Sequence, residues 1–70
     1  MKLKVRSTFV EDDGNIPVYV LAEYLERKVF IELLRKGVIY KQTDNYSRRG
    51  YVWAVDEDAA KRNGITLEEI

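Results

Sequence analysis

One sequence feature most constrains how this chain can fold. It is a helix-like run that ends in Leu-Leu-Arg-Lys-Gly and leads into two β-like segments. Gly37 stands where a helix C-cap is expected, because glycine adopts the left-handed backbone conformation without a steric penalty. Residues 38–43 and 51–55 are rich in β-branched and aromatic side chains, which favour antiparallel pairing. Residues 33–55 therefore predict the end of a helix followed by a β-hairpin.

Residues 17–36 are predicted to form one central helix. Asn15 can act as its N-cap, and proline is tolerated in a first helical turn, where its missing N–H has no intrahelical partner. Alternation over residues 16–20 would also fit an extended start, and a break at residues 26–28 would give two short helices instead. At helical spacing the segment carries two apolar stripes. One can be buried by a sheet, and the other by another copy of the chain, a terminal helix or a partner. The second stripe is a candidate dimer face and consists of Val20, Tyr24, Ile31 and Leu34.

The two ends of the chain carry shorter elements. Residues 2–10 alternate like a half-buried strand, and the Asp-Gly and Gly-Asn pairs after them predict a turn. Asp56 or Asp58 can cap a short helix that stops at Asn63-Gly64, and the tail after it either begins another turn or frays. Residues 1–70 are thus predicted to be a single α+β domain with an N-terminal strand, one long or broken central helix, a wing-like β-hairpin and a short C-terminal helix.

The chain contains neither cysteine nor histidine. Without cysteine it has no disulfide or cysteine–zinc framework, and the cytoplasm is the expected location. Histidine is the commonest metal ligand and general base, and no serine elbow or phosphate-binding glycine loop replaces it. We therefore expect a non-enzymatic protein that needs no metal and no cofactor. No run approaches the roughly 20 apolar residues that span a membrane, so no membrane partner is expected.

Charge is unevenly distributed along the chain, although the formal net charge is zero. Residues 27–49 contain seven basic and two acidic side chains, a net charge of +5, and the remaining residues carry −5. The sharpest functional feature is the pair Arg48 and Arg49 beside Tyr46 and Tyr51. Guanidinium groups match phosphate oxygens, and aromatic rings can lie along bases or sugars. The same loop can also be interpreted as a solvated hairpin tip whose arginines prevent edge pairing.

The candidate binding residues for nucleic acid or an acidic partner share positive charge or an aromatic ring. They are Arg27, Lys28, Arg35, Lys41, Tyr46, Arg48, Arg49 and Tyr51.

Residues 29–64 resemble the second half of small winged-helix regulators, such as the C-terminal domains of phage antirepressors. The resemblance lies in the run Leu33-Leu34-Arg35-Lys36-Gly37-Val38-Ile39, in the hairpin with a basic loop, and in the terminal segment reading VDEDAAKRNG. It implies that the hairpin is a wing whose two arginines contact phosphates. It also implies that Arg27, Lys28 and Arg35 lie near a recognition helix.

These patterns favour a small regulatory protein that binds DNA through the hairpin and the adjoining helix, as a homodimer if the second apolar stripe pairs two copies. One alternative is a protein-binding module, such as a phage-type inhibitor that docks on the acidic surface of a larger host enzyme. Another is a homo-oligomeric structural subunit.

Overall fold

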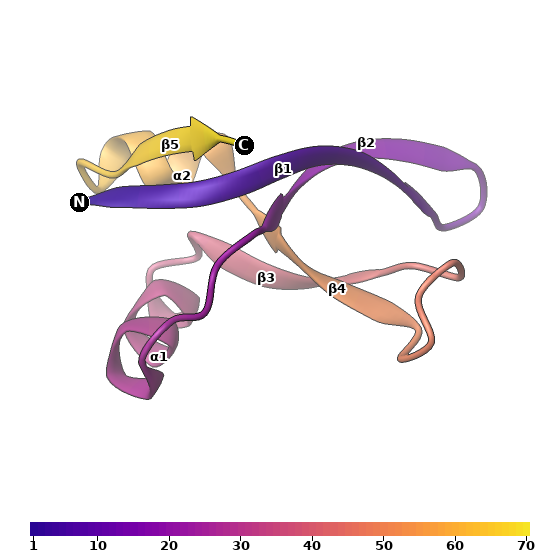
Figure 1. Ribbon diagram of the computed structural model, residues 1–70, viewed down its shortest axis with the longest axis horizontal. Coiled ribbons are helices and arrows are strands. Elements are labelled where there is room, and N and C mark those ends of the chain that lie inside the picture. The colour runs from indigo at the N-terminus through magenta and orange to yellow at the C-terminus, as the bar shows by residue number, and fades with distance from the viewer.

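The chain folds into a mixed five-stranded sheet with two short helices on it (Figure 1). The computed structural model describes residues 1–70. In chain order the elements are β1 (Lys2–Glu11), β2 (Asn15–Leu21), α1 (Arg27–Arg35), β3 (Ile39–Thr43), β4 (Tyr51–Val55), α2 (Glu57–Arg62) and β5 (Thr66–Glu69). The strands are ordered β3-β4-β2-β1-β5, and only the β1–β5 pair is parallel.

The predicted architecture with a long central helix is wrong. Strands hold 44% of the residues and helices only 21%, so the chain is not a helix-dominated winged helix. The error lies in the segment Asn15–Leu21, which forms β2 and pairs antiparallel with β1. Pro17 fits there because β4 pairs with β2 only at Tyr19 and Val20, and proline is tolerated where a strand has a neighbour on one side alone.

The apolar stripe predicted as a dimer face is also lost with the long helix. Val20 lies on β2 and is buried, whereas Tyr24 lies in the connection to α1 and is 93% exposed. Only Ile31 and Leu34 remain on α1, where both are partly exposed. These four side chains therefore do not form one helix face.

Both helices end where the sequence predicts. Gly37 follows α1 with a φ of 72°, the left-handed conformation expected of a C-cap glycine. The Asp56 carboxylate caps α2 by accepting the backbone N–H of Ala59 at 3.0 Å. At the other end of α2, the Asn63 side chain donates to the carbonyl of Ala59 at 2.8 Å, and Gly64 follows with a φ of 68°.

Apolar side chains are buried on both faces of the sheet. Val20 and Ala54 are cross-strand partners, so their side chains point away from the face that carries Tyr19 and Val55. Val20 and Ala54 are buried, as is Val10, and none of the three belongs to the main core. The main core lies between the sheet and the two helices and consists of Leu3, Val5, Leu33, Val38, Ile39, Val55, Ala59, Ala60 and Ile65.

The tail after α2 forms a strand rather than a further turn or a frayed end. Its residues Thr66–Glu69 pair parallel with the start of β1, so that Lys2 lies opposite Thr66 and Val5 opposite Glu69. The first and last strands of the chain are therefore neighbours (Figure 1). Neither helix is long and apolar enough to cross a membrane.

Candidate functional site

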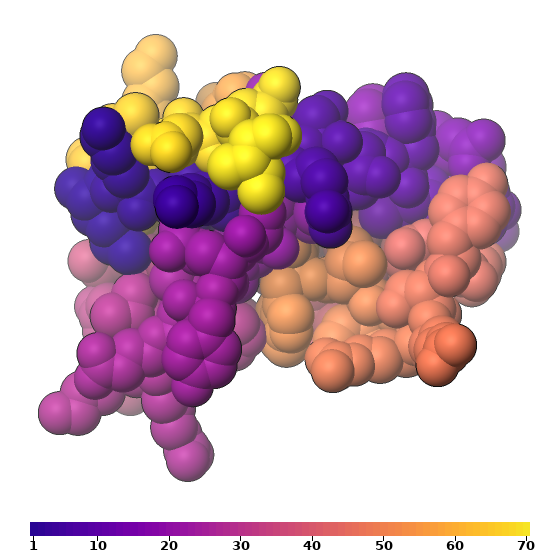
Figure 2. Space-filling view, in the orientation of Figure 1, coloured from indigo at the N-terminus to yellow at the C-terminus, as the bar shows by residue number.

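The loop between β3 and β4, which carries both candidate arginines, is fixed to the tip of the β1–β2 hairpin. Asp44 is only 6% exposed, and its Oδ1 accepts the backbone N–H groups of Glu11 and Tyr46, both at 3.1 Å. The backbone N–H of Asn45 donates to the carbonyl of Glu11 at 2.9 Å. In Figure 2 the atoms of this loop (salmon) pack against the β1–β2 end of the molecule (indigo to violet). These hydrogen bonds therefore hold the β3–β4 loop against the tip of the β1–β2 hairpin.

Further bonds set the conformation of the loop itself. The Tyr46 hydroxyl donates to Oδ1 of Asn15 at 2.9 Å, which leaves most of its ring exposed. The hydroxyl of Ser47 accepts the backbone N–H of Arg49 at 3.3 Å. Gly50 has a φ of 83°, which favours glycine and turns the chain into β4. Arg48 and Arg49 therefore project from a defined turn.

The candidate cations have no carboxylate partner within the molecule. One ion pair is present in the whole chain, between Nζ of Lys36 and Oε1 of Glu32 at 3.7 Å. The arginines of the loop and the basic residues of α1 are exposed and lie outside any ion pair. An external group of negative charge can reach these guanidinium and ammonium groups without first displacing an internal carboxylate.

Aromatic rings form a row from α1 to the β3–β4 loop. The Phe30 ring of α1 meets Trp53 edge to face, with centroids 4.9 Å apart, and Trp53 meets Tyr51 with centroids 5.7 Å apart. Lys41 lies opposite Trp53 in the β3–β4 ladder, and its Nζ is 4.3 Å from the centroid of the Tyr51 ring. Such contacts combine dispersion with the attraction of a cation to an aromatic face.

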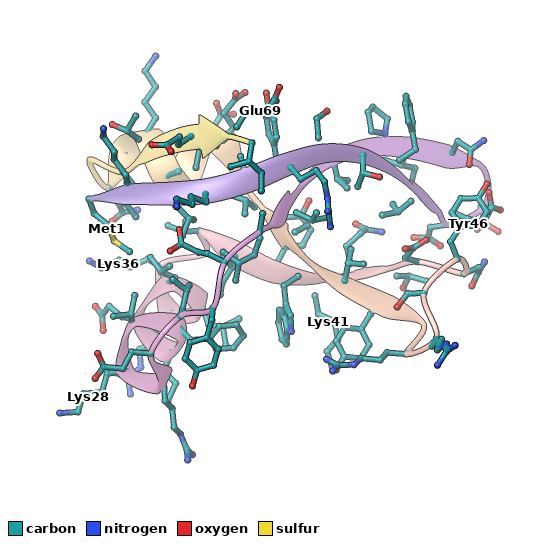
Figure 3. All side chains as sticks on the ribbon, viewed as in Figure 1. Met1, Lys28, Lys36, Lys41, Tyr46 and Glu69 are labelled. Atoms are coloured by element: carbon teal, nitrogen blue, oxygen red, sulfur yellow. The ribbon has the colours of Figure 1, made fainter.

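The residues predicted as a site form an extended strip rather than converging on one point. Figure 3 shows Lys28 on α1 at one end of the molecule, Lys41 near the middle and Tyr46 at the other end. The molecule is 31 Å long in this direction. Arg48, Arg49 and Tyr51 belong with Lys41 and Tyr46 on the hairpin and its loop, whereas Arg27 and Arg35 lie with Lys28 on α1. We call these eight residues the basic strip.

Phe30 and Trp53 adjoin this strip, and Phe30 also packs against the main core. Both rings are partly exposed. A signal for Trp53 was present, because it alternates with Tyr51 on one strand and therefore shares its face. No local signal could have placed Phe30 there, since its contact depends on how α1 crosses the hairpin.

Two carboxylates lie near Tyr19 of β2. The nearby carboxylate of Glu69 raises the pKa of the Tyr19 phenol above its ordinary value, with smaller contributions from the charge of Glu57 and from burial. Glu69 and Lys41 lie on opposite sides of the molecule in Figure 3. No group of three or more acidic side chains is arranged to hold a metal ion.

Three hollows indent the surface. One of about 450 Å³ lies between α1 and the α2–β5 connection, and one of about 440 Å³ lies beside the start of α2. The third, of about 370 Å³, lies between β2 and β4 and is lined by Arg49 and Tyr51 of the basic strip, together with Arg6 and Trp53. Only this third hollow combines arginines with the aromatic row.

No known protein family, curated protein or solved structure matches this chain.

Proposed function

We propose that this protein is a small, non-enzymatic regulator that acts in the cytoplasm and binds DNA along the basic strip. The observation that carries the proposal is the lack of any internal carboxylate partner for the cations of the strip. Interspersed charges of both signs are enough to keep a protein soluble, whereas the hairpin here places Lys41 beside the rings of Tyr51 and Trp53, with two arginines in the adjoining loop. Phosphates are the ligands that such a surface suits best.

The two arginines of the loop would supply the phosphate contacts. The buried Asp44 carboxylate holds the backbone of their turn, so little backbone conformational entropy is lost when they bind. Lys41 and the arginines and lysine of α1 would extend these contacts along the strip. Release of counterions from the phosphates then supplies much of the affinity.

Salt-dependent DNA binding tests this proposal. Fluorescence anisotropy of a labelled DNA at low salt should show binding that weakens linearly on a plot of log affinity against log salt. The double variant Arg48→Ala/Arg49→Ala should bind about tenfold or more weakly, and the slope should fall by about two, one for each lost phosphate contact.

The matched control is Lys61→Ala/Arg62→Ala, which removes the same charge from the exposed end of α2, outside the basic strip. This control should retain nearly full affinity. No DNA binding at low salt, or equal losses in the two double variants, would contradict the proposal.

A second candidate is a protein-binding module that docks the same strip on the acidic surface of a larger protein. It is favoured by the exposed rings of Tyr24 and Tyr46, which are 93% and 68% exposed, because protein interfaces are enriched in tyrosine. Capture from a host lysate separates the two functions. A partner held through Arg48 and Arg49 after nuclease treatment favours the protein-binding module, and one lost with the nucleic acid favours DNA binding.

A further inference from the structure

The sheet splits between β2 and β4. The two strands are paired only through Tyr19 with Val55 and Val20 with Ala54. Towards the start of β4 the ladder to β2 ends, and the hollow of about 370 Å³ lies between the separated segments. We call this hollow the strand-split groove.

Two arginines from different elements reach this groove. Arg6 comes from β1, where it pairs with Val20, and Arg49 comes from the anchored β3–β4 loop. Neither guanidinium forms an ion pair with any carboxylate of the chain. The Ser47 hydroxyl, which accepts the backbone N–H of Arg49, lines the groove as well. This arrangement presents two fork-shaped donors to one small volume, and such donors match phosphate oxygens.

The rest of the groove suits a flat, partly polar group. Apolar lining comes from Val20, Leu21 and Val52, and Trp53 adds an aromatic surface. Glu23 also lines it. One of its carboxylate oxygens accepts the backbone N–H of Lys4 at 2.6 Å, which holds the side chain in place and leaves the other oxygen for a ligand donor.

We infer that the strand-split groove binds one nucleotide of a single-stranded nucleic acid. The base enters the gap between the two strands beside Trp53 and Leu21, and the phosphate lies between Arg6 and Arg49. Glu23 accepts a hydrogen bond from an exocyclic amino group of the base. This inference rests on the proposed function and narrows it, because a base inside a duplex is stacked and paired and must leave the helix to enter such a groove.

Volume and chemistry both support a nucleotide. Pockets for small ligands begin at about 300 Å³, and a groove of about 370 Å³ accommodates one unit rather than a double helix. The Glu23 carboxylate also predicts a preference among bases, because adenine, cytosine and guanine carry amino donors and thymine carries none.

The experiment uses the intrinsic fluorescence of Trp53, the only tryptophan of the chain. The protein is titrated with oligo(dC), oligo(dT) and a duplex of equal length at one low salt concentration. We expect oligo(dC) to quench the emission, and to bind about tenfold more tightly than the duplex because an unstacked base gains stacking energy. Oligo(dT) should quench but bind more weakly than oligo(dC).

Arg6→Ala is the test variant, and Lys2→Ala is its matched control. Both residues are exposed cations on β1, but only Arg6 lines the groove. Arg6→Ala should reduce the affinity for oligo(dC) about tenfold and affect the duplex much less, whereas Lys2→Ala should reduce both slightly and equally. Circular dichroism of both variants should remain that of the parent, because neither side chain is buried.

Outcomes that overturn the inference differ from those that overturn the proposed function. If DNA binds but duplex and single strands bind equally and Trp53 emission does not change, the groove is not a nucleotide site and the DNA-binding proposal stands. Equal effects of Arg6→Ala and Lys2→Ala would lead to the same conclusion. If no nucleic acid binds at low salt, both proposals are wrong.

Discussion

The two β-hairpins of this protein place a tyrosine in opposite electrostatic surroundings. Tyr19 of β2 lies near the carboxylates of Glu69 and Glu57, which raise the pKa of its phenol. Tyr51 of β4 instead has the ammonium group of Lys41 4.3 Å from its ring centroid. A net charge of zero therefore conceals local surroundings of opposite sign, and it is the local charge that determines which ligands bind.

The hairpins also differ in what supports them. The β1–β2 hairpin closes with a short turn, and its buried side chains Val5 and Val10 are fully enclosed. The β3–β4 hairpin ends in a longer loop, whose shape depends on hydrogen bonds to Glu11 in the first hairpin. We infer that the first hairpin is mainly a scaffold and that the second presents the contact surface.

The largest expected effect comes from the scaffold hairpin. Leu3 of β1 is fully buried in the main core, whereas Phe9 of the same strand is 62% exposed. Leu3→Ala should lower the free energy of unfolding by about 2–5 kcal/mol, enough to unfold much of such a small domain. Phe9→Ala should change it by less than about 0.5 kcal/mol. Urea denaturation followed by circular dichroism measures both losses. Similar losses for the two variants would show that the burial of a side chain on β1 does not determine how much it contributes to stability.

The next effect separates the anchor of the loop from its contact residues. Asp44→Ala leaves two backbone N–H groups without an acceptor and should cost about 2 kcal/mol. Arg48→Ala, in the same loop, removes an exposed side chain and should cost less than about 0.5 kcal/mol. Thermal denaturation measures both values. Amide hydrogen exchange at Tyr46 should accelerate only in the Asp44 variant, and unchanged exchange there would show that the carboxylate does not anchor the loop.

The smallest effect concerns the acidic surroundings of Tyr19. Because the pKa of Tyr19 is raised in the folded protein, its contribution to stability is fully present below the pKa of the unfolded chain. That contribution is lost as pH rises through the folded pKa, above about 10. Glu69→Gln removes the largest cause, so the Tyr19 pKa should fall towards its ordinary value and the alkaline loss of stability should shrink.

Nuclear magnetic resonance titration of the Tyr19 ring measures this change, with the Tyr51 ring as an internal control in the same sample. An unchanged Tyr19 pKa in the Glu69→Gln variant would mean that the Glu69 carboxylate does not produce the electrostatic difference between the two tyrosines.

The elements that sequence reasoning placed correctly are those with local signals. Gly37 ends α1, Asp56 caps α2, and the segments Ile39–Thr43 and Tyr51–Val55 pair as the predicted hairpin. Each of these depends on a backbone conformation or a cap that a few adjacent residues determine. The alternation at the start of the chain likewise indicated β1.

The elements that could not be predicted depend on distant partners. The segment Asn15–Leu21 carries apolar residues that fit either a helix or a strand, and its pairing with β1 decided the outcome. The tail forms β5 only because the edge of β1 is available to it. For the same reason sequence reasoning could not bring Arg6 and Glu23 together with Arg49, because the three line one hollow only where the sheet splits.

The parallel pairing of β1 with β5 has a consequence for biosynthesis. Thr66 leaves the ribosome 64 residues after its partner Lys2. Until then Leu3 and its strand edge lack a neighbour, so this edge of the sheet is completed only after the other strands can pair. A premature stop codon before residue 66 would leave that edge open to other nascent chains, and such products should be cleared or should aggregate.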